Sequence, residues 1–182
     1  MNSQSSGWIQ FQGPRLLTIG NSGSGKTWLA GNLADVLRLP VIHLDDMHWE
    51  PGHYGIAREV SLRDRLVQEA AAEDKWIMEG VYGQLANMVL GRVTTLIWLD
   101  MPEQECIANV HRRGIQGGGS ETHFRDLLSW IAEYRVRKNN WNSFDAHQRL
   151  FDKYHGPKVR MTNRLEITAY LNSLISRAGI SN

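Results

Sequence analysis

The segment LLTIGNSGSGKTWLAGNLADVL, residues 16–37, constrains the fold of this chain more than any other stretch. A short apolar run leads into a turn rich in glycine and serine, and leucines and alanines at helical spacing follow. The turn matches the pattern G-x-x-x-x-G-K-[ST] over Gly20, Asn21, Ser22, Gly23, Ser24, Gly25, Lys26 and Thr27. Glycines let consecutive N–H groups converge on phosphate oxygens, and the next helix points its positive end at them. The segment therefore predicts a strand, a phosphate-binding loop and a helix in succession.

Two side chains of this loop carry its phosphate chemistry. Lys26 has the position from which a lysine reaches the β- and γ-phosphates, and the Thr27 hydroxyl has that of a Mg²⁺ ligand. A chance match is disfavoured because a strand pattern precedes the loop and a helix pattern follows it. We therefore expect Mg-ATP to bind here. The Asn-Lys-x-Asp guanine clamp of GTPases is absent, although the motif itself does not separate ATP from GTP.

The order of the predicted elements indicates an α/β fold. Predicted strands lie at 15–19, 41–44, 75–79, 94–99 and 158–161. Predicted helices lie at 29–37, 56–72, 103–113, roughly 124–138, and 164–176. Strands that alternate with helices predict a five-stranded parallel sheet covered on both faces, in the three-layer αβα arrangement of P-loop NTPases. We expect a polar tail at 1–14 and one domain at 15–182, with a short lid at about 113–124.

Composition and charge narrow the classes of function. No apolar run is long enough to span a bilayer, and the N-terminal residues lack the pattern of a secretory signal. The single cysteine, Cys106, predicts a buried thiol rather than a disulfide, so we expect a cytoplasmic protein with no membrane contact. Residues 1–100 carry 8 Lys and Arg against 11 Asp and Glu, whereas residues 101–182 carry 12 against 8. The basic second half fits nucleic acid, an anionic small substrate, or ordinary solvated surface.

Acidic residues follow three of the predicted strands. The right-handed crossover rule places these strand ends at the same edge of the sheet as the phosphate loop. We expect Asp45 to face the phosphoryl acceptor or the metal, with Asp46 as the alternative, and Glu79 to lie near the metal. Asp100 ends LIWLDMP, which is typical of a Walker B strand, but Met101 replaces the acid that primes water in ATPases.

The motifs HLD, WEPG, WIMEGVY, LIWLDMP and HRRG follow the loop in this order. Their order resembles the nucleoside monophosphate kinase superfamily over roughly 15–175, and within it the adenylate kinase-related DNA topology modulation proteins. The resemblance implies transfer of the γ-phosphoryl group of ATP to a small acceptor, a nucleotide or a nucleotide-like molecule. Glu79 and Gly80 match the Asp-Gly of adenylate kinases, but Val81-Tyr82-Gly83 lacks the Pro-Arg that follows there.

The resemblance also implies roles for arginines. Arg113 takes the place of the lid arginine that contacts the donor nucleotide, and Arg135 and Arg137 resemble the arginines that close on the transferred group. The acceptor region is expected at about 45–82. A stacking surface and one cation for a planar anionic acceptor are offered there by His48, Trp49, Tyr54, Arg58 and Tyr82. Trp28, Trp76 and Trp98 are expected in the core.

Two alternatives stay open beside a nucleotide acceptor. One is a small-metabolite kinase of the shikimate or gluconate type, and the other is a nucleotide-dependent regulatory protein that binds nucleic acid. The basic second half is the only support for the latter, since no long basic face with interleaved aromatic residues is evident. The acceptor and the oligomeric state are not fixed by the sequence.

Overall fold

The computed structural model describes residues 14–115 and 120–178, so most of the predicted tail and the centre of the predicted lid lie outside the described residues. Its central sheet has five parallel strands in the order β2-β5-β1-β6-β7. The strands are β1 (Arg15–Gly20), β2 (Val41–His43), β5 (Trp76–Gly80), β6 (Thr95–Leu99) and β7 (Lys158–Met161). The predicted parallel α/β fold and all five of its strands are confirmed. Their buried, β-branched and leucine-rich runs fit a sheet that is covered on both faces.

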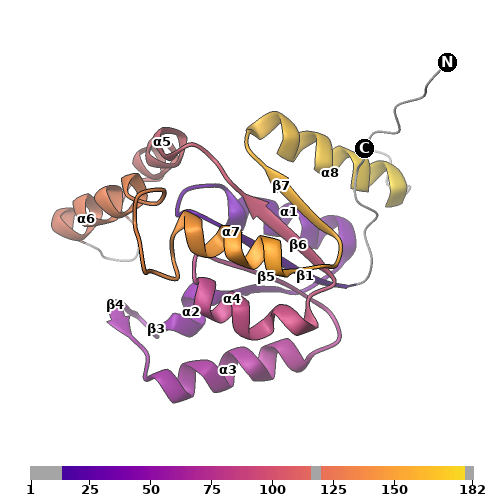
Figure 1. The fold of residues 1–182 in the computed structure, drawn as a ribbon, viewed down its shortest axis with the longest axis horizontal. Coiled ribbons are helices and arrows are strands. Elements are labelled where there is room, and N and C mark those ends of the chain that lie inside the picture. Colours follow the sequence, from indigo (N-terminus) through magenta and orange to yellow (C-terminus); the bar gives the residue numbers. More distant parts are fainter. Residues whose placement is uncertain (1–13, 116–119, 179–182) are drawn as a thin grey trace.

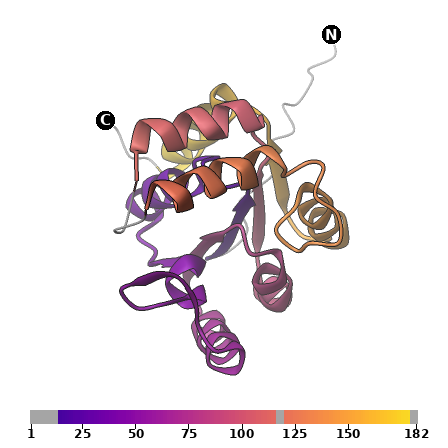
Figure 2. The ribbon, with the colours of Figure 1, turned by 90° about the vertical axis from the view of Figure 1, so that its left-hand side faces the viewer.

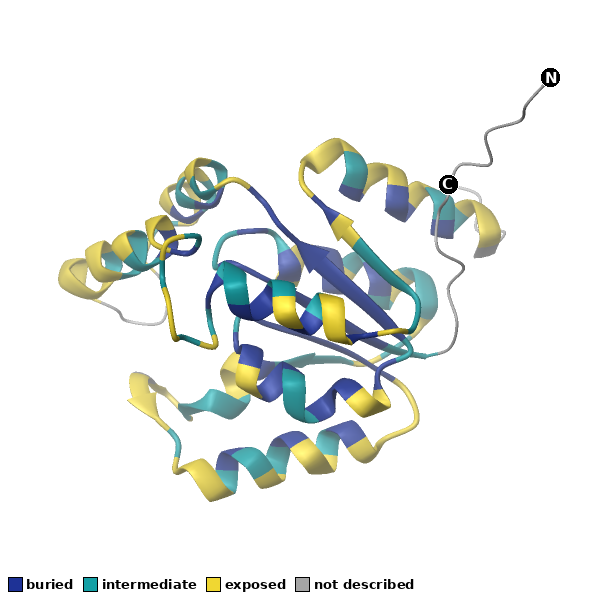
Figure 3. Cartoon of the chain, in the orientation of Figure 1, coloured by how far each residue is buried: buried dark blue, intermediate teal, exposed yellow. Residues whose placement is uncertain are grey.

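Helices cover both faces of the sheet (Figures 1 and 2). Side chains that alternate along the strands build a core on each face. One core joins Leu16 and Ile97 to helices α1 (Lys26–Leu37), α5 (Glu103–Arg113), α6 (Glu121–Ala132) and α8 (Arg164–Ala178). The other joins Leu17 and Trp98 to α3 (Val60–Ala72), α4 (Gly83–Val89) and α7 (Phe144–Lys153). In Figure 3 the central strands are buried, and the helices around them carry both buried and exposed residues. No helix within 14–115 and 120–178 combines the length and apolarity that crossing a membrane requires.

The region after β2 differs from the prediction of one helix at 56–72. A short helix α2 (Leu44–His48) carries Asp45 and Asp46, and an antiparallel hairpin of β3 (Trp49–Glu50) and β4 (His53–Ala57) follows it. Helix α3 begins only at Val60, where the Glu59 carboxylate accepts hydrogen bonds from the amides of Ser61 and Leu62. The cap ends the hairpin and sets the start of the helix.

The helix predicted at roughly 124–138 is present, but it begins and ends earlier than predicted. Helix α6 spans Glu121–Ala132, and a separate helix α7 starts at Phe144 after an irregular connection. In that connection Asn139 has a left-handed φ of 51°, and the Ser143 hydroxyl accepts a hydrogen bond from the amide of Ala146 to cap α7. Helix α4 and the 3₁₀ turn η1 (Leu90–Arg92) were also not predicted.

Candidate active site

The phosphate loop connects β1 to α1 in a conformation that depends on glycine. Gly23 has a φ of 78°, and a Cβ at this position would lie 2.4 Å from the carbonyl oxygen of Cys106. A Cβ at Gly20 would likewise lie 2.4 Å from the carbonyl oxygen of Leu99. The loop is therefore pressed against α5 and β6, where no side chain fits.

Hydrogen bonds from within the loop and from α6 support its shape. The Lys26 ammonium, which is nearly buried, donates to the carbonyl oxygen of Asn21 over 2.8 Å. The Asn21 side chain donates to Ile131 and accepts from the amide of Ser22. The buried Ser24 hydroxyl has no hydrogen-bond partner in the part of the chain that the structure describes. An orphaned hydroxyl beside a lysine and converging amides fits a site that takes phosphate oxygens.

Glu79 stands beside this loop because β5 is the neighbour of β1 in the sheet. Its carboxylate is almost fully buried, and its Oε1 accepts a hydrogen bond from the Thr27 hydroxyl over 3.0 Å. The same Oε1 lies 2.7 Å from Nδ1 of His43 at the end of β2. Within the described residues no cluster of three or more His, Cys, Asp or Glu side chains is placed to hold a metal. One carboxylate and one hydroxyl suit a Mg²⁺ that phosphate and water also coordinate.

Asp45 is held on α2 by an aromatic cluster. Its Oδ1 accepts a hydrogen bond from the Tyr82 hydroxyl over 2.5 Å, and the His48 ring stacks on Tyr82 with ring centres 4.3 Å apart. Trp49 meets His48 edge-on at 4.4 Å. Burial, followed by the charge of Arg63, lowers the pKa of His48, so its ring is neutral near pH 7. Asp46 is exposed and is not among the residues that line the cavity described below.

Arg58 does not face the cavity as the predicted acceptor cation. Its guanidinium donates to the carbonyl oxygens of Met47, Asp46 and Trp49 at 3.0, 3.1 and 3.1 Å. These oxygens belong to the end of α2 and the start of β3, where the helix leaves carbonyls unsatisfied. Arg58 thus fixes the backbone that carries Asp45.

Arg135 lies in the connection after α6 and contacts Asp100, which directly follows β6, and Glu103 of α5. It donates to Asp100 Oδ1 over 2.6 Å and lies 3.0 Å from Glu103 Oε1. Arg160 of β7 donates through Nε and a terminal nitrogen to Asp100 Oδ2 at 2.9 and 2.5 Å. Asp100, which is 3% exposed, therefore has two arginine partners. The nearby acids raise the pKa of Arg135 against the opposing effect of burial.

Arg137 is engaged away from the loop. Its guanidinium lies 3.3 Å from the centre of the Trp130 ring and donates to the carbonyl oxygens of Trp130 and Asn142. Burial lowers its pKa. Neither Arg135 nor Arg137 lines the cavity at the phosphate loop.

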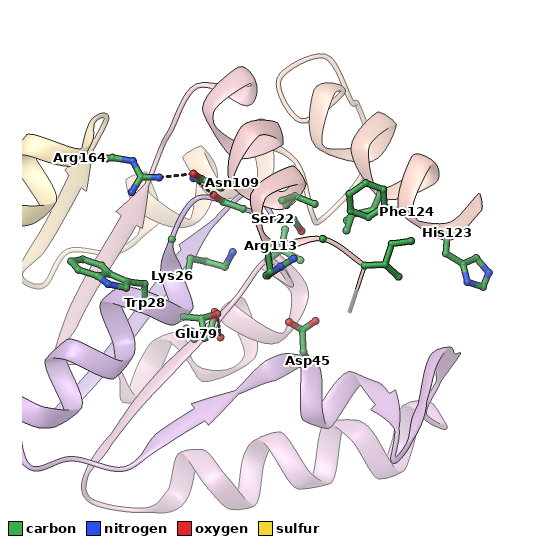
Figure 4. Close-up of a pocket in the computed structure, with 18 of the residues that line it drawn as sticks. Ser22, Lys26, Trp28, Asp45, Glu79, Asn109, Arg113, His123, Phe124 and Arg164 are labelled. Carbon is green, nitrogen blue, oxygen red and sulfur yellow. Dashed lines mark hydrogen bonds between the residues drawn. The ribbon is translucent and has the colours of Figure 1, made fainter. Parts of the chain in front are cut away.

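That cavity has a volume of about 580 Å³ and opens between the loop, α2, α5 and α6 (Figure 4). Lys26, Thr27, Asp45, Glu79 and Arg113 all line it. In Figure 4 the side chains of Asp45, Lys26 and Arg113 point into one common space. The structure therefore brings together the loop, both acids and the lid arginine that the sequence singled out.

The sequence analysis missed or wrongly placed three further residues that line the cavity. Trp28 was expected in the core, and that expectation was wrong, because the residue is 56% exposed and borders the cavity. Asn109 lies one helical turn before Arg113 on α5, a spacing that could have revealed it. Arg164 opens α8 directly after β7, so the rule of sheet edges could have revealed it too.

Cys106 is buried on α5, as predicted. Burial raises the pKa of its thiol to about 12, so it stays protonated and unreactive.

Comparison with known proteins identifies solved structures that share this fold. No family model matches the chain, and no curated protein matches its sequence. Among solved structures, shikimate kinase from Acinetobacter baumannii in complex with shikimate aligns with a TM-score of 0.59, 12% identity, and coverage of 93% of this chain and 95% of that one. Gluconokinase from Sinorhizobium meliloti 1021 aligns with a TM-score of 0.55, 16% identity, and coverage of 92% and 94%.

Shikimate kinase from Aquifex aeolicus vf5 aligns with a TM-score of 0.51, 16% identity, and coverage of 92% and 99%. These likenesses lie at 12–16% identity and show the fold alone, so the resemblance to nucleoside monophosphate kinases and to DNA topology modulation proteins stays a prediction. The chain has the three-layer fold of P-loop kinases.

Proposed function

We propose that this chain is an ATP-dependent phosphotransferase that moves the γ-phosphoryl group of Mg-ATP to a hydroxyl group of a small metabolite. One observation carries the proposal: Asp45 lines the same cavity as Lys26 of the phosphate loop and Glu79. A loop with this motif binds a triphosphate, and a carboxylate across from it can accept the proton of an attacking hydroxyl.

Each residue has a distinct task in this reaction. Backbone amides of the loop and Lys26 bind the phosphates, and Thr27 and Glu79 are the candidate Mg²⁺ ligands. Mg²⁺, when bound, neutralises charge on the phosphate oxygens. The hydroxyl oxygen of the acceptor attacks the γ-phosphorus, the bond from that phosphorus to ADP breaks, and Asp45 takes the hydroxyl proton. Arg113 lies where it can neutralise the transferred group.

A hydroxyl metabolite suits the part of the cavity around Asp45 better than a nucleoside monophosphate does. Arg58, which was predicted to bind the acceptor, instead donates hydrogen bonds to carbonyl oxygens of α2 and β3. Tyr82 and Gly83 stand where adenylate kinases have Pro-Arg. The structural neighbours named above, a gluconokinase and two shikimate kinases, also agree with a small acceptor.

The basic second half gives little support to nucleic-acid binding. Several of its cations are paired with acids, namely Arg135 and Arg160 with Asp100, Arg164 with Glu105, and Lys138 with Asp145. Paired cations release few counterions when a phosphate backbone approaches. Retention on DNA at two salt concentrations tests this alternative directly.

The proposal is tested by measuring ADP formation from Mg-ATP with a panel of sugars, polyols, sugar acids and nucleoside monophosphates. We expect one class of acceptor to stimulate turnover, and Lys26→Ala to abolish it while the protein stays folded. ATP binding without stimulation by any acceptor would count against phosphotransfer.

A further inference from the structure

Trp28 is a large aromatic residue that the fold leaves exposed at the cavity. It follows Thr27 directly in the first turn of α1, it is 56% exposed, and it lines the same cavity as Lys26 and Thr27. The next two residues, Leu29 and Ala30, are fully buried, so α1 packs against the core without the indole. A ligand that covered this ring would remove a large apolar area from water.

The backbone of Trp28 belongs to the end of α1 that binds phosphate. The amide of Leu29 donates to the carbonyl oxygen of Gly25 over 2.9 Å, which is the first hydrogen bond of the helix. The amides of Lys26, Thr27 and Trp28 precede it, and amides in a first turn have no acceptor within their own helix. Such amides bind phosphate oxygens. Because helical side chains tilt toward the N-terminus, the indole of Trp28 begins beside the phosphates held there.

The two ends of a bound nucleoside triphosphate point to different parts of the cavity. The γ-phosphate must face Asp45 if that carboxylate is to take the proton of the acceptor. The sugar and the base are at the other end of the triphosphate and therefore lie away from Asp45. In Figure 4 Trp28 and Asp45 lie on opposite sides of Lys26, so the base leaves the phosphate loop on the side of Trp28.

Arg164 of α8 lies on the same side of Lys26 as Trp28 in Figure 4, and its position is fixed by two partners. Its Nε lies 2.5 Å from Glu105 Oε1, and a terminal nitrogen donates to Asn109 Oδ1 over 2.6 Å. Asn109 lines the cavity as well. A planar group that lies on the indole therefore has a fixed polar wall beside it.

The other aromatic residues that line the cavity are farther from this side. His123 and Phe124 belong to α6, and Figure 4 shows both beyond Arg113 as seen from Trp28. Among the lining residues of the described chain, Trp28 is thus the one that offers an aromatic face where the base leaves the loop.

We propose that the base of the nucleoside triphosphate stacks on the indole of Trp28. The proposal rests on the proposed function, which sets the direction of the triphosphate, and adds to it a residue that binds the base. Every base has a face that can stack on an aromatic ring. Trp28 therefore contributes affinity for the nucleotide and does not select between ATP and GTP.

The first test compares a ligand that has a base with one that lacks it. The non-hydrolysable ATP analogue AMP-PNP and inorganic tripolyphosphate, each with Mg²⁺, are titrated into the protein by calorimetry without an acceptor. We expect Trp28→Ala to bind AMP-PNP roughly tenfold more weakly and tripolyphosphate with unchanged affinity. Trp28→Phe keeps an aromatic face and should lose less affinity for AMP-PNP. Trp141→Ala, at a tryptophan that is 45% exposed outside the cavity lining, should bind both ligands normally.

Two results would overturn the proposal. One is equal affinity of the unaltered protein and Trp28→Ala for AMP-PNP. The other is an equal loss for AMP-PNP and tripolyphosphate, because the substitution would then act on the phosphate loop rather than on the base. Neither result involves phosphoryl transfer, so an acceptor panel that fails to stimulate ADP formation leaves the stacking proposal standing.

A spectroscopic measurement reports the stacking directly. The fluorescence of 2-aminopurine is quenched when this base stacks on an aromatic ring, so the triphosphate of its riboside is bound to saturation and its emission recorded. Quenching should be strong in the unaltered protein and in Trp141→Ala, and largely relieved in Trp28→Ala. Equal quenching in all three proteins would place the base away from Trp28.

Discussion

The pH dependence of unfolding should report on one histidine, His147 of α7. The ring is fully buried, with Nδ1 2.6 Å from the Tyr134 hydroxyl oxygen and Nε2 3.0 Å from the carbonyl oxygen of Val81. The indole N–H of Trp98 donates to the same hydroxyl oxygen over 3.3 Å. The tyrosine proton is therefore directed to Nδ1, and the ring carries its own proton on Nε2. Burial lowers the pKa of His147 to about 3.

The sign and size of the effect follow from this lowered pKa. Between the folded value and the unfolded value of about 6.5, the unfolded chain binds a proton that the folded chain excludes, so the free energy of unfolding falls as pH falls. From pH 7 to pH 5 the loss due to His147 amounts to about 2 kcal/mol, because this interval lies above the folded pKa.

Urea unfolding followed by tryptophan fluorescence at pH 7 and pH 5 measures the loss. The unaltered protein should lose about 2 kcal/mol more over this interval than His147→Gln. His155→Gln, which changes an exposed histidine, should behave like the unaltered protein. An equal pH dependence in the unaltered protein and His147→Gln would refute the buried neutral ring.

Three further changes test other parts of the structure. Tyr134→Phe removes a hydroxyl that is hydrogen-bonded to the buried side chains of Trp98 and His147, so it should lower the free energy of unfolding by about 2–3 kcal/mol. The control Tyr154→Phe loses one hydrogen bond to a backbone carbonyl and should lower it by about 1 kcal/mol. Gly23→Ala introduces a clash with the backbone of α5 and backbone strain of about 1–3 kcal/mol, so a fluorescent ATP analogue should bind roughly tenfold more weakly or worse. The control Gly31→Ala adds a methyl group in open space and should bind the analogue normally. Tyr82→Phe removes the hydrogen bond to the carboxylate of Asp45, the proposed base, and should lower kcat by roughly tenfold with an unchanged KM for ATP. An unchanged kcat would show that Tyr82 does not position Asp45 for the reaction.

The sequence predicted the features that are encoded locally. The glycine and lysine spacing of the loop specifies its conformation within eight residues, and the buried strands are continuous apolar runs. Parallel topology then places Asp45, Glu79 and the loop at one edge of the sheet without knowledge of any contact. These features needed only short-range patterns and a general rule of chain connection.

The partners of the arginines could not be predicted in the same way. Arg58 binds carbonyls that become available only because α2 ends where it does, and Arg135 pairs with Asp100 from 35 residues away. Trp28 was expected in the core, yet it lies next to the buried Leu29 at the start of α1 and borders the cavity instead. Each outcome depends on how separate elements meet, which no local pattern records.

The paired arginines on Asp100 have a consequence for exchanging the α5–α6 segment between proteins of this fold. Arg135 belongs to the connection that follows α6, whereas Asp100 directly follows β6 and Arg160 lies in β7. A transplanted segment that ended without an arginine at this position would remove one partner from a carboxylate that is 3% exposed. The exchangeable module therefore extends through residue 135, and a graft that ends at the last residue of α6 would cut across an ion pair.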